Sequence, residues 1–323
     1  MKLCDLLKDL DNDYSKEETS FFNSTGLELL GTESFNVVSA PSISVVIPAY
    51  KAHKTLPLVL RALNQQVYLA MGGELEVIVI DDDSPIPALD ISNLPILSFR
   101  LRYIKQERNS GAGAARDRGI SEAKGDIIVF IDADVLLPKN FLSNHAFAHT
   151  HLNAQNIMIS FRKNIDFRLA ENMTEFISPT ENLNDHRVHM IFKKEWVMRP
   201  NEESLVGKEF SLLNQTNLFK DFGHLRQIEL WTLPMMVLTC AMSVSREAAM
   251  KAIPSPVGLR GWGFNDTCMA AKMMAYTKAK VVPLLNSNVL HIIEENHTKL
   301  DYVKNEEYLE NEKVYNSLLQ EEI

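Results

Sequence analysis

The first half of the chain alternates between short apolar runs and stretches in which apolar residues recur at helical spacing. The runs are continuous and rich in valine and isoleucine, which is typical of strands that are buried on both faces. Strands are predicted at residues 43–47, 75–80, 100–104 and 127–131, and helices at residues 55–67, 112–123 and 138–148. This order predicts an α/β fold, with a mostly parallel central sheet and helices on both faces.

The second half of the chain is less regular. Residues 160–232 are polar with few clear periods, which leaves two interpretations open: an inserted region that shapes a substrate site, or an irregular surface excursion. Strand or helix patterns return at residues 235–244, 246–252, 266–277, 280–282 and 288–293. Two further segments flank this core: an N-terminal extension, residues 1–40, with one short amphipathic helix, and a charged C-terminal helix at residues 301–323.

Composition excludes several classes of function. Of the 323 residues, 46% are apolar and 23% are charged, as in ordinary soluble globular proteins. The net charge of −9 gives no support to general nucleic-acid binding, although it allows a local basic site for one phosphorylated ligand. The three cysteines indicate neither a disulfide framework nor a zinc cluster. No apolar run approaches the roughly 18 residues of a membrane helix. We therefore expect a cytoplasmic protein with no transmembrane segment.

Polar groups follow three of the predicted strands. They are residues 48–50 (Pro-Ala-Tyr), 81–84 (Asp-Asp-Asp-Ser) and 132–134 (Asp-Ala-Asp, a DxD motif). Ligands of open parallel sheets bind at the carboxyl ends of the strands, so these groups are predicted to share one edge. Carboxylates gathered at one edge repel each other. A hard divalent cation bound between them would offset this repulsion and could also bind phosphates. The alternative for each aspartate is a turn or helix cap.

Five segments together carry a resemblance to a known family. The sequence resembles family 2 glycosyltransferases, whose nucleotide-sugar-binding α/β fold is called GT-A. The resemblance is dense over residues 43–150 and resumes near residues 239–297. The segments are SVVIPAYKAHKTL (44–56), EVIVIDDDS (76–84), NSGAGAARDRGI (109–120), GDIIVFIDADVLLPKNFL (125–142) and GWGFND (261–266). The resemblance implies a nucleotide-sugar-binding half at residues 41–155 and an acceptor-binding half at residues 156–300. The insertion at residues 160–232 would shape the choice of acceptor.

The resemblance also implies roles for the residues at the strand ends. Tyr50 would stack on the base of a UDP-sugar, and Asp82 would accept a hydrogen bond from the uracil N–H. Asp134 would bind a metal ion, Mn²⁺ or Mg²⁺, and His291 would be a further ligand to it. The remaining contacts to the nucleotide-sugar would come from Pro48, Asp81, Arg116, Ala133 and Asp132, the last of which faces either the ribose or the metal.

The glycine-rich segment at residues 261–266 would form the acceptor side. Trp262, Gly263 and Asn265 would contact the acceptor, and Asp266 would be the general base. Two alternatives stay open here: Asp266 as a helix cap only, and a structural His291 with His297 as the metal ligand instead. Large and basic side chains in the insertion could also meet a sugar or a phosphate, although a solvated face is the alternative: Trp196, Trp231, Lys193, Lys194 and Arg199.

The expected function is therefore metal-dependent transfer of a sugar from a UDP-sugar, with inversion, to a glycan, lipid-linked or peptide acceptor. Peripheral contact with a membrane fits a lipid-linked acceptor. Two rivals stay open. One is a retaining transferase of the same fold, for which a similar tryptophan-glycine motif exists. The other is a nucleotide-sugar-binding module that has lost turnover, which the departures from the family pattern at Lys51 and Asn265 keep open. The departures at Asp83 and Asp117 affect the detail of the donor sugar more than the class of protein. A nicotinamide site at residues 111–116 is disfavoured because these residues do not follow the first strand.

Overall fold

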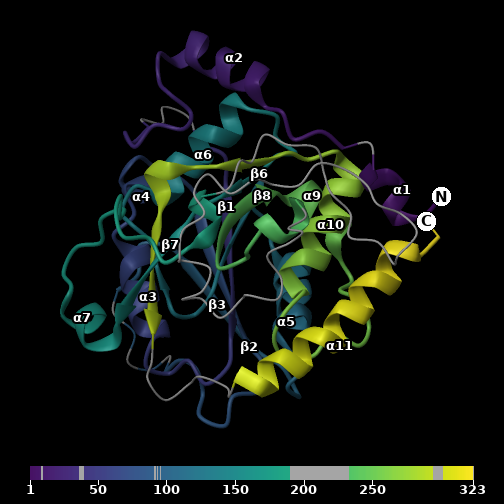
Figure 1. Cartoon of the computed structure of the whole chain (residues 1–323). Coiled ribbons are helices and arrows are strands. Elements are labelled where there is room, and N and C mark those ends of the chain that lie inside the picture. Colours follow the sequence, from purple (N-terminus) through teal and green to yellow (C-terminus); the bar gives the residue numbers. More distant parts are fainter. Residues whose placement is uncertain are drawn as a thin grey trace.

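The computed structural model describes residues 1–8, 10–35, 40–90, 92, 94, 96–189, 233–293 and 301–322. The described strands form a seven-stranded sheet in the order β3-β2-β1-β4-β8-β6-β9 and a three-stranded sheet in the order β5-β10-β7 (Figure 1). The strands are β1 (Ile43–Ala49), β2 (Leu75–Asp81), β3 (Arg100–Lys105), β4 (Ile127–Ile131), β5 (Val135–Leu136), β6 (Ile157–Ile159), β7 (Arg162–Asp166), β8 (Ala241–Ser245), β9 (Val281–Pro283) and β10 (Val289–Ile293).

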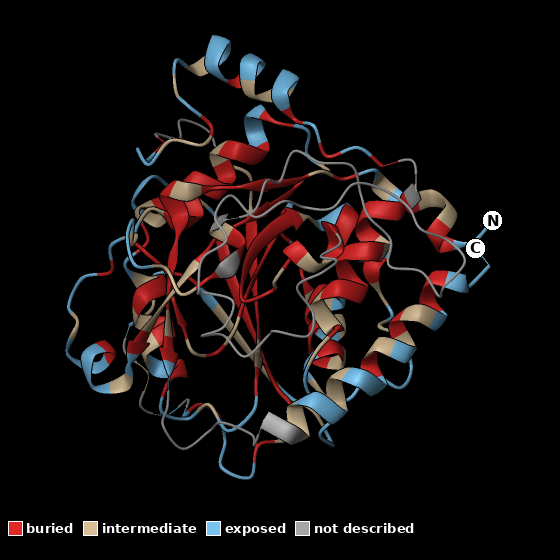
Figure 2. Ribbon diagram, in the orientation of Figure 1, coloured by how far each residue is buried: buried red, intermediate tan, exposed pale blue. Residues whose placement is uncertain are grey.

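Helices cover the large sheet on both faces. The α-helices are α1 (Leu3–Lys8), α2 (Ser15–Thr25), α3 (Leu56–Asn64), α4 (Val67–Ala70), α5 (Ala112–Glu122), α6 (Phe141–His151), α7 (Phe167–Asn172), α9 (Arg246–Ala252), α10 (Asn265–Thr277) and α11 (Asp301–Gln320). Short 3-10 helices are η2 (His186–His189), η3 (Leu233–Met236) and η4 (Leu285–Ser287). In Figure 2 the strands and the inner faces of the helices are buried, whereas α2 and α11 are exposed along their outer faces.

The alternation of side chains along the strands explains the two helical layers. β1 pairs in parallel with β2 and with β4, and Val45 is opposite Val77 on one side and Val129 on the other. These three side chains belong to a core cluster that includes α3, whereas Val46 belongs to a second cluster, which includes α5, α9 and α10. Because both faces are buried, β2 and β4 are apolar almost throughout. The predicted fold class is confirmed.

The small sheet closes one side of the edge at which β1, β2 and β4 end. β10 pairs antiparallel with β5 and in parallel with β7, so His291 lies opposite Val135 and Asn164. β5 begins directly after the 132–134 segment that ends β4. This pairing places His291, which is far from β4 in the sequence, at the carboxyl end of the large sheet.

The N-terminal residues pack against this same chain. Asn12 lies against the edge strand β9: its Oδ1 accepts from the Val281 N–H at 2.7 Å, and its Nδ2 donates to the Val281 carbonyl at 3.1 Å. The Phe21 ring of α2 lies 5.3 Å from Phe35 and 5.8 Å from Phe147 of α6. Asn12 therefore covers backbone groups that the edge of the sheet would otherwise expose.

Two elements differ from the sequence pattern. Residues 235–244, predicted as one strand, are split: Met235 and Met236 belong to η3, and β8 begins only at Ala241. Leu238 and Cys240, between the two elements, line a cavity instead of extending the sheet. β7 lies inside the segment predicted to be irregular. Its sequence, Arg-Lys-Asn-Ile-Asp, is polar because the strand is only half-buried, so the hydrophobic pattern gives no sign of it. Trp196, Trp231, Lys193, Lys194, Arg199 and His297 lie outside the described residues.

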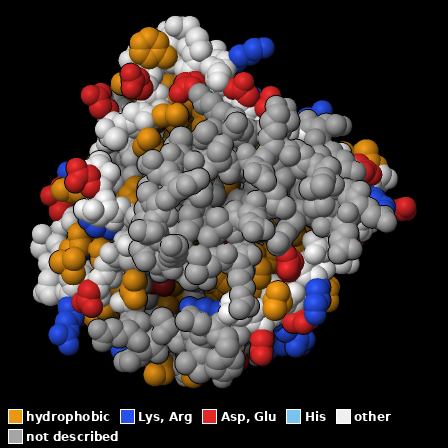
Figure 3. Space-filling model, viewed as in Figure 1, with side chains coloured by type: hydrophobic (Ala, Val, Ile, Leu, Met, Phe, Trp, Pro, Cys, Tyr) orange, Lys and Arg blue, Asp and Glu red, His pale blue; other side chains and the backbone are white. Residues whose placement is uncertain are grey.

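The visible surface carries charges of both signs. Figure 3 shows acidic side chains over α2 and a mixture of acidic and basic side chains along α11. The described part of this face shows no continuous basic stripe of the kind that nucleic-acid binding requires, in keeping with the net charge of −9. Among the described helices, none is both long and apolar enough to cross a bilayer.

Two buried histidines link α6 to the large sheet. His145 Nδ1 lies 2.7 Å from Ser243 Oγ, and His149 Nε2 lies 2.9 Å from the same oxygen. Burial lowers the pKa of His149 to about 4, and burial together with the neighbouring His149 lowers the pKa of His145 well below its usual value. Both imidazoles are therefore neutral in the folded chain.

We predict that stability falls as the pH drops from about 6.5 toward 4. In this window the histidines bind protons in the unfolded chain but stay neutral in the folded chain. His149 alone should therefore lower the free energy of unfolding at pH 5 by about 2 kcal/mol. Urea titrations at pH 7.5 and pH 5 measure this loss. His149→Asn should remove about that share of the pH dependence, whereas His53→Asn, at an exposed position, should leave it unchanged. An equal pH dependence in His149→Asn would contradict the assignment.

Candidate functional site

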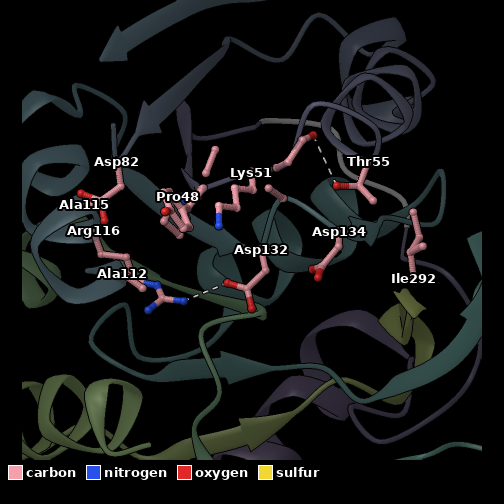
Figure 4. Close-up of a pocket in the computed structure, with 14 residues that line it drawn as sticks. Pro48, Lys51, Thr55, Asp82, Ala112, Ala115, Arg116, Asp132, Asp134 and Ile292 are labelled. Carbon is pink, nitrogen blue, oxygen red and sulfur yellow. Dashed lines mark hydrogen bonds and ion pairs between the residues drawn. The ribbon is translucent and has the colours of Figure 1, made fainter. Parts of the chain in front are cut away.

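The first cavity, of about 340 Å³, lies at the carboxyl edge of β1, β2 and β4. Figure 4 shows the side chains of Lys51, Asp132 and Asp134 converging on it, with Arg116 and Asp82 on one side. Its other lining residues are Pro48, Ala49, Tyr50, Ala52, Thr55, Ala112, Ala115, Ala133 and Ile292. The structure thus brings together the polar groups that follow three separate strands.

The loop after β1 presents an aromatic ring and a cation. Tyr50 is half exposed, at 48%, and Lys51 Nζ lies 5.1 Å from the centre of the Tyr50 ring. Lys51 has a left-handed backbone, φ +57°, and its N–H donates to Ser84 Oγ at 3.0 Å. This hydrogen bond joins the loop after β1 to the loop after β2.

Asp82 organises the loop that precedes α5. Its Oδ1 accepts from Gln106 Nε2 at 2.6 Å and from the Ser110 N–H at 2.8 Å, and its Oδ2 accepts from the Gly111 N–H at 2.8 Å. An ionised carboxylate has about four acceptor positions, so one remains on Oδ2. Asp82 is therefore both a structural anchor for the start of α5 and a possible acceptor for a ligand in the first cavity.

Asp81 is fully buried and does not line the first cavity. It accepts hydrogen bonds from the Ser84 N–H, the Ala88 N–H and the Tyr103 hydroxyl. Burial alone would raise the pKa of Asp81, but these hydrogen bonds outweigh it and lower the pKa. The geometry gives Asp81 the task of shaping the loop after β2, and the predicted ligand contact stays a prediction.

Asp134 and His291 meet across β5 and β10. Asp134 Oδ2 lies 3.7 Å from His291 Nε2, and Asn164 Oδ1 lies 3.3 Å from the other ring nitrogen. Burial and the charge of Arg162 lower the pKa of His291 to about 4, although Asp132 opposes this. A neutral imidazole beside a carboxylate is a donor set that fits a divalent cation such as Mn²⁺. The described residues hold no ready-made group of three or more His, Cys, Asp and Glu ligands, so phosphate oxygens would have to complete the shell.

Arg116 stands between the first cavity and a second one. It is buried, and its Nη2 donates to Asp132 Oδ1 at 2.8 Å, while its Nη1 lies 3.5 Å from Asp266 Oδ1. Burial alone would lower the pKa of Arg116, but Asp266 and Asp132 raise it overall. The second cavity has about 300 Å³ and shares Arg116, Asp132 and Ala112 with the first. Asp132 is thus already engaged in an ion pair.

Asp266 lies in the second cavity at the start of α10. Its Oδ1 also accepts from Thr239 Oγ1 at 2.6 Å. The N-terminus of a helix favours a negative charge, and Arg116 adds to this. Trp262, Gly263 and Asn265 line the same cavity, and Trp262 is 40% exposed. The structure therefore brings the glycine-rich segment and the DxD segment together at Arg116, although more than a hundred residues separate them.

The C-terminal helix α11 holds the glycine-rich segment in place. The Asn311 side chain donates to the carbonyls of Arg260, Trp262 and Gly263 at 2.9–3.0 Å, and accepts from the Arg260 N–H at 3.0 Å. Gly261 has φ +66°, and a Cβ there would come within 2.2 Å of the Glu307 carboxylate. The left-handed backbone favours glycine at this turn, and a larger residue would also displace the Glu307 carboxylate from its place beside the segment.

Asn311→Ala should destabilise the chain by about 1–2 kcal/mol, because it removes four part-buried hydrogen bonds to the backbone of residues 260–263. Urea unfolding at pH 7.5 measures the change. Asn305→Ala, at an exposed position of the same helix, should cost less than about 0.5 kcal/mol. Equal effects of the two substitutions would show that the Asn311 contacts do not hold the segment.

Sequence reasoning missed two contributors to the site. Arg162 lines the second cavity, and Asn311 fixes the segment at residues 261–266. Neither has a local signal, because each acts across the fold from a segment without a recognised motif. Thr239, which orients Asp266, lies inside the block near residues 239–297 where the family resemblance resumes. Two departures from the family pattern have structural reasons: Asp83 takes a left-handed backbone, φ +58°, and Asp117 accepts from the Ser255 N–H and hydroxyl.

Comparison with known proteins decides the family. The model of the family described as "Glycosyl transferase family 2" matches residues 44–222, which is more than half of the chain. The chain belongs to glycosyl transferase family 2. Among curated family 2 relatives, "Uncharacterized glycosyltransferase YfnE" of Bacillus subtilis (strain 168) is 34% identical over 116 residues, 36% of this chain and 28% of YfnE. "Amylovoran biosynthesis glycosyltransferase AmsB" of Erwinia amylovora is 35% identical over 96 residues, 29% of this chain and 31% of AmsB.

Each of these alignments spans about a third or less of the relative's length. Solved structures with the same fold are more distant in sequence. The crystal structure of GalNAc-T7 with UDP, GalNAc and Mn²⁺ gives a TM-score of 0.53 at 17% identity, over 90% of this chain and 55% of that one. The structure of S. aureus TarS 1-349 in complex with UDP-GlcNAc gives a TM-score of 0.50 at 15% identity, over 86% of this chain and 71% of that one. These likenesses show that this family 2 chain shares their fold.

Proposed function

We propose that this family 2 chain transfers a sugar from a UDP-sugar, with inversion and with a divalent metal ion, to a hydroxyl of a glycan, lipid-linked or peptide acceptor. The observation that carries the proposal is that the two cavities meet at Arg116 and Asp132. A donor in the first cavity and an acceptor in the second would come together where Asp266 stands. The two structures with the same fold hold UDP and UDP-GlcNAc respectively, which supports the choice of nucleotide.

The first cavity suits a uridine diphosphate. Tyr50 offers an exposed ring for stacking on the base, and the remaining acceptor position of Asp82 can take the uracil N–H. Pro48 and Ala133 line the walls, while Lys51 and Arg116 supply positive charge for the phosphates. Asp134 and His291 would hold the metal, which when bound would offset the negative charge that develops on the departing diphosphate.

Asp266 is the proposed general base. Thr239 and Arg116 both contact its Oδ1, and no donor to Oδ2 is found in the described part of the chain. Oδ2 can therefore take the proton of an acceptor hydroxyl in the second cavity. The acceptor oxygen then forms its bond to the anomeric carbon from the face opposite the diphosphate. The bond between that carbon and the phosphate oxygen breaks, and UDP leaves with the electron pair.

Asp266→Asn should keep UDP affinity within about twofold and lower sugar transfer by about 10²–10⁴-fold, because the amide cannot take the proton. UDP release measured with and without acceptor tests this, next to Asp11→Asn as a control at an exposed carboxylate. Loss of both binding and transfer would give Asp266 a structural role instead. Proton NMR of the product's anomeric centre tests inversion, and retained configuration would contradict it.

Asp134→Asn should abolish the part of UDP binding that depends on Mn²⁺ and leave the binding measured in EDTA unchanged. The reason is that an amide is a far weaker ligand to a hard cation than a carboxylate. Thermal-shift titrations of UDP with Mn²⁺, with Mg²⁺ and with EDTA measure both parts. Asp83→Asn, at the exposed carboxylate next to Asp82, is the matched control. An unchanged response of Asp134→Asn to Mn²⁺ would refute the metal assignment.

A further inference from the structure

Arg162 is the first residue of β7 and lines the second cavity. Because side chains alternate along a strand, Arg162 lies on the same face of β7 as Asn164, which contacts His291. Arg162 therefore stands where the proposed metal pair and the acceptor side meet.

The Arg162 guanidinium has no protein partner among the described residues. Its Nε is shut off from solvent and makes no hydrogen bond, and no described carboxylate lies within ion-pair distance of the side chain. Of the nearby carboxylates, Asp185 is held on both oxygens by Arg187 at 2.7–2.9 Å, and Asp132 is held by Arg116. Burial alone would lower the pKa of the half-buried Arg162, but the charges around it, including those of Asp185, Asp132 and Asp134, raise it overall. The guanidinium is therefore charged, and it makes no hydrogen bond among the described residues, so an anionic ligand can supply the acceptors that it lacks.

The second cavity also leaves Arg162 as its unengaged cation. Four charged side chains line the cavity, and Arg116 contacts both carboxylates, those of Asp132 and Asp266. Its volume of about 300 Å³ is at the lower end of small-ligand sites, which are about 300–1,000 Å³. Trp262 offers an apolar face in the same cavity, as a sugar ring requires.

Resting on the proposed function, we propose that Arg162 binds the carboxylate or phosphate of an anionic sugar at the junction of the two cavities. The fork of the guanidinium matches both groups in a bidentate geometry. The anionic sugar is either the acceptor or the sugar being transferred. The substrate class is thus acidic carbohydrate: a uronic acid or a sugar phosphate.

Ligand-observed NMR with UDP and the diamagnetic Mg²⁺ present tests the acceptor source, with methyl β-glucuronide, glucose 6-phosphate and the neutral methyl β-glucoside as probes. The wild-type chain should bind at least one anionic probe about tenfold more tightly than the neutral one, and Arg162→Met should erase this preference. Arg162→Lys, which keeps the charge but loses the fork, should restore part of it. The control Arg168→Met, at an exposed position of α7, should leave the preference intact.

Affinities for UDP-glucuronic acid and UDP-glucose test the transferred sugar as the source. A preference for the acidic donor that Arg162→Met removes, without any preference among the free sugars, places the anion on the donor and supports the site. No anionic preference in either arm, or a preference that survives Arg162→Met, overturns the proposal while UDP binding stays intact. Failure of the wild-type chain to bind UDP would instead refute the proposed function. Unaltered UDP affinity and unfolding of Arg162→Met show that the variant is folded.

Discussion

The site depends on one buried guanidinium. Arg116 is enclosed on α5 and contacts two carboxylates that come from distant parts of the chain, Asp132 after β4 and Asp266 on α10. Removing a charge from water is costly, and opposite charges at short distance offset that cost. The two carboxylates therefore hold Arg116, and Arg116 in turn fixes the position of the DxD segment relative to the glycine-rich segment.

The rest of the fold places the partners of this ion pair. The parallel pairing of β1, β2 and β4 brings three strand ends to one edge, and Asp82 anchors the start of α5 by accepting from the loop before it. On the other side, α11 holds the glycine-rich segment through Asn311, and Thr239 orients Asp266. The groups that line the first cavity and those that line the second are thus fixed by separate supports, and both sets converge on Arg116.

The sequence predicted the parts of the fold whose signal is local. The apolar runs of β1, β2 and β4 and the aspartates behind them are visible because buried strands must be apolar and strand ends must be polar. β7 was not predictable, since a half-buried strand in a small sheet has no hydrophobic period. Arg162 and Asn311 were missed for a related reason: their importance comes from contacts across the fold. Asp81 shows the opposite limit of the motif. It lies inside a recognised motif, yet its contacts shape the loop after β2.

A crystal structure of the chain with UDP and Mn²⁺ would show directly whether the two cavities work together at Arg116. We expect the uracil between Tyr50 and Asp82, the metal on Asp134 and His291, and the diphosphate beside Arg116 at the opening to the second cavity. UDP bound away from Arg116, or Asp82 and Asp134 facing different clefts in the complex, would contradict this expectation.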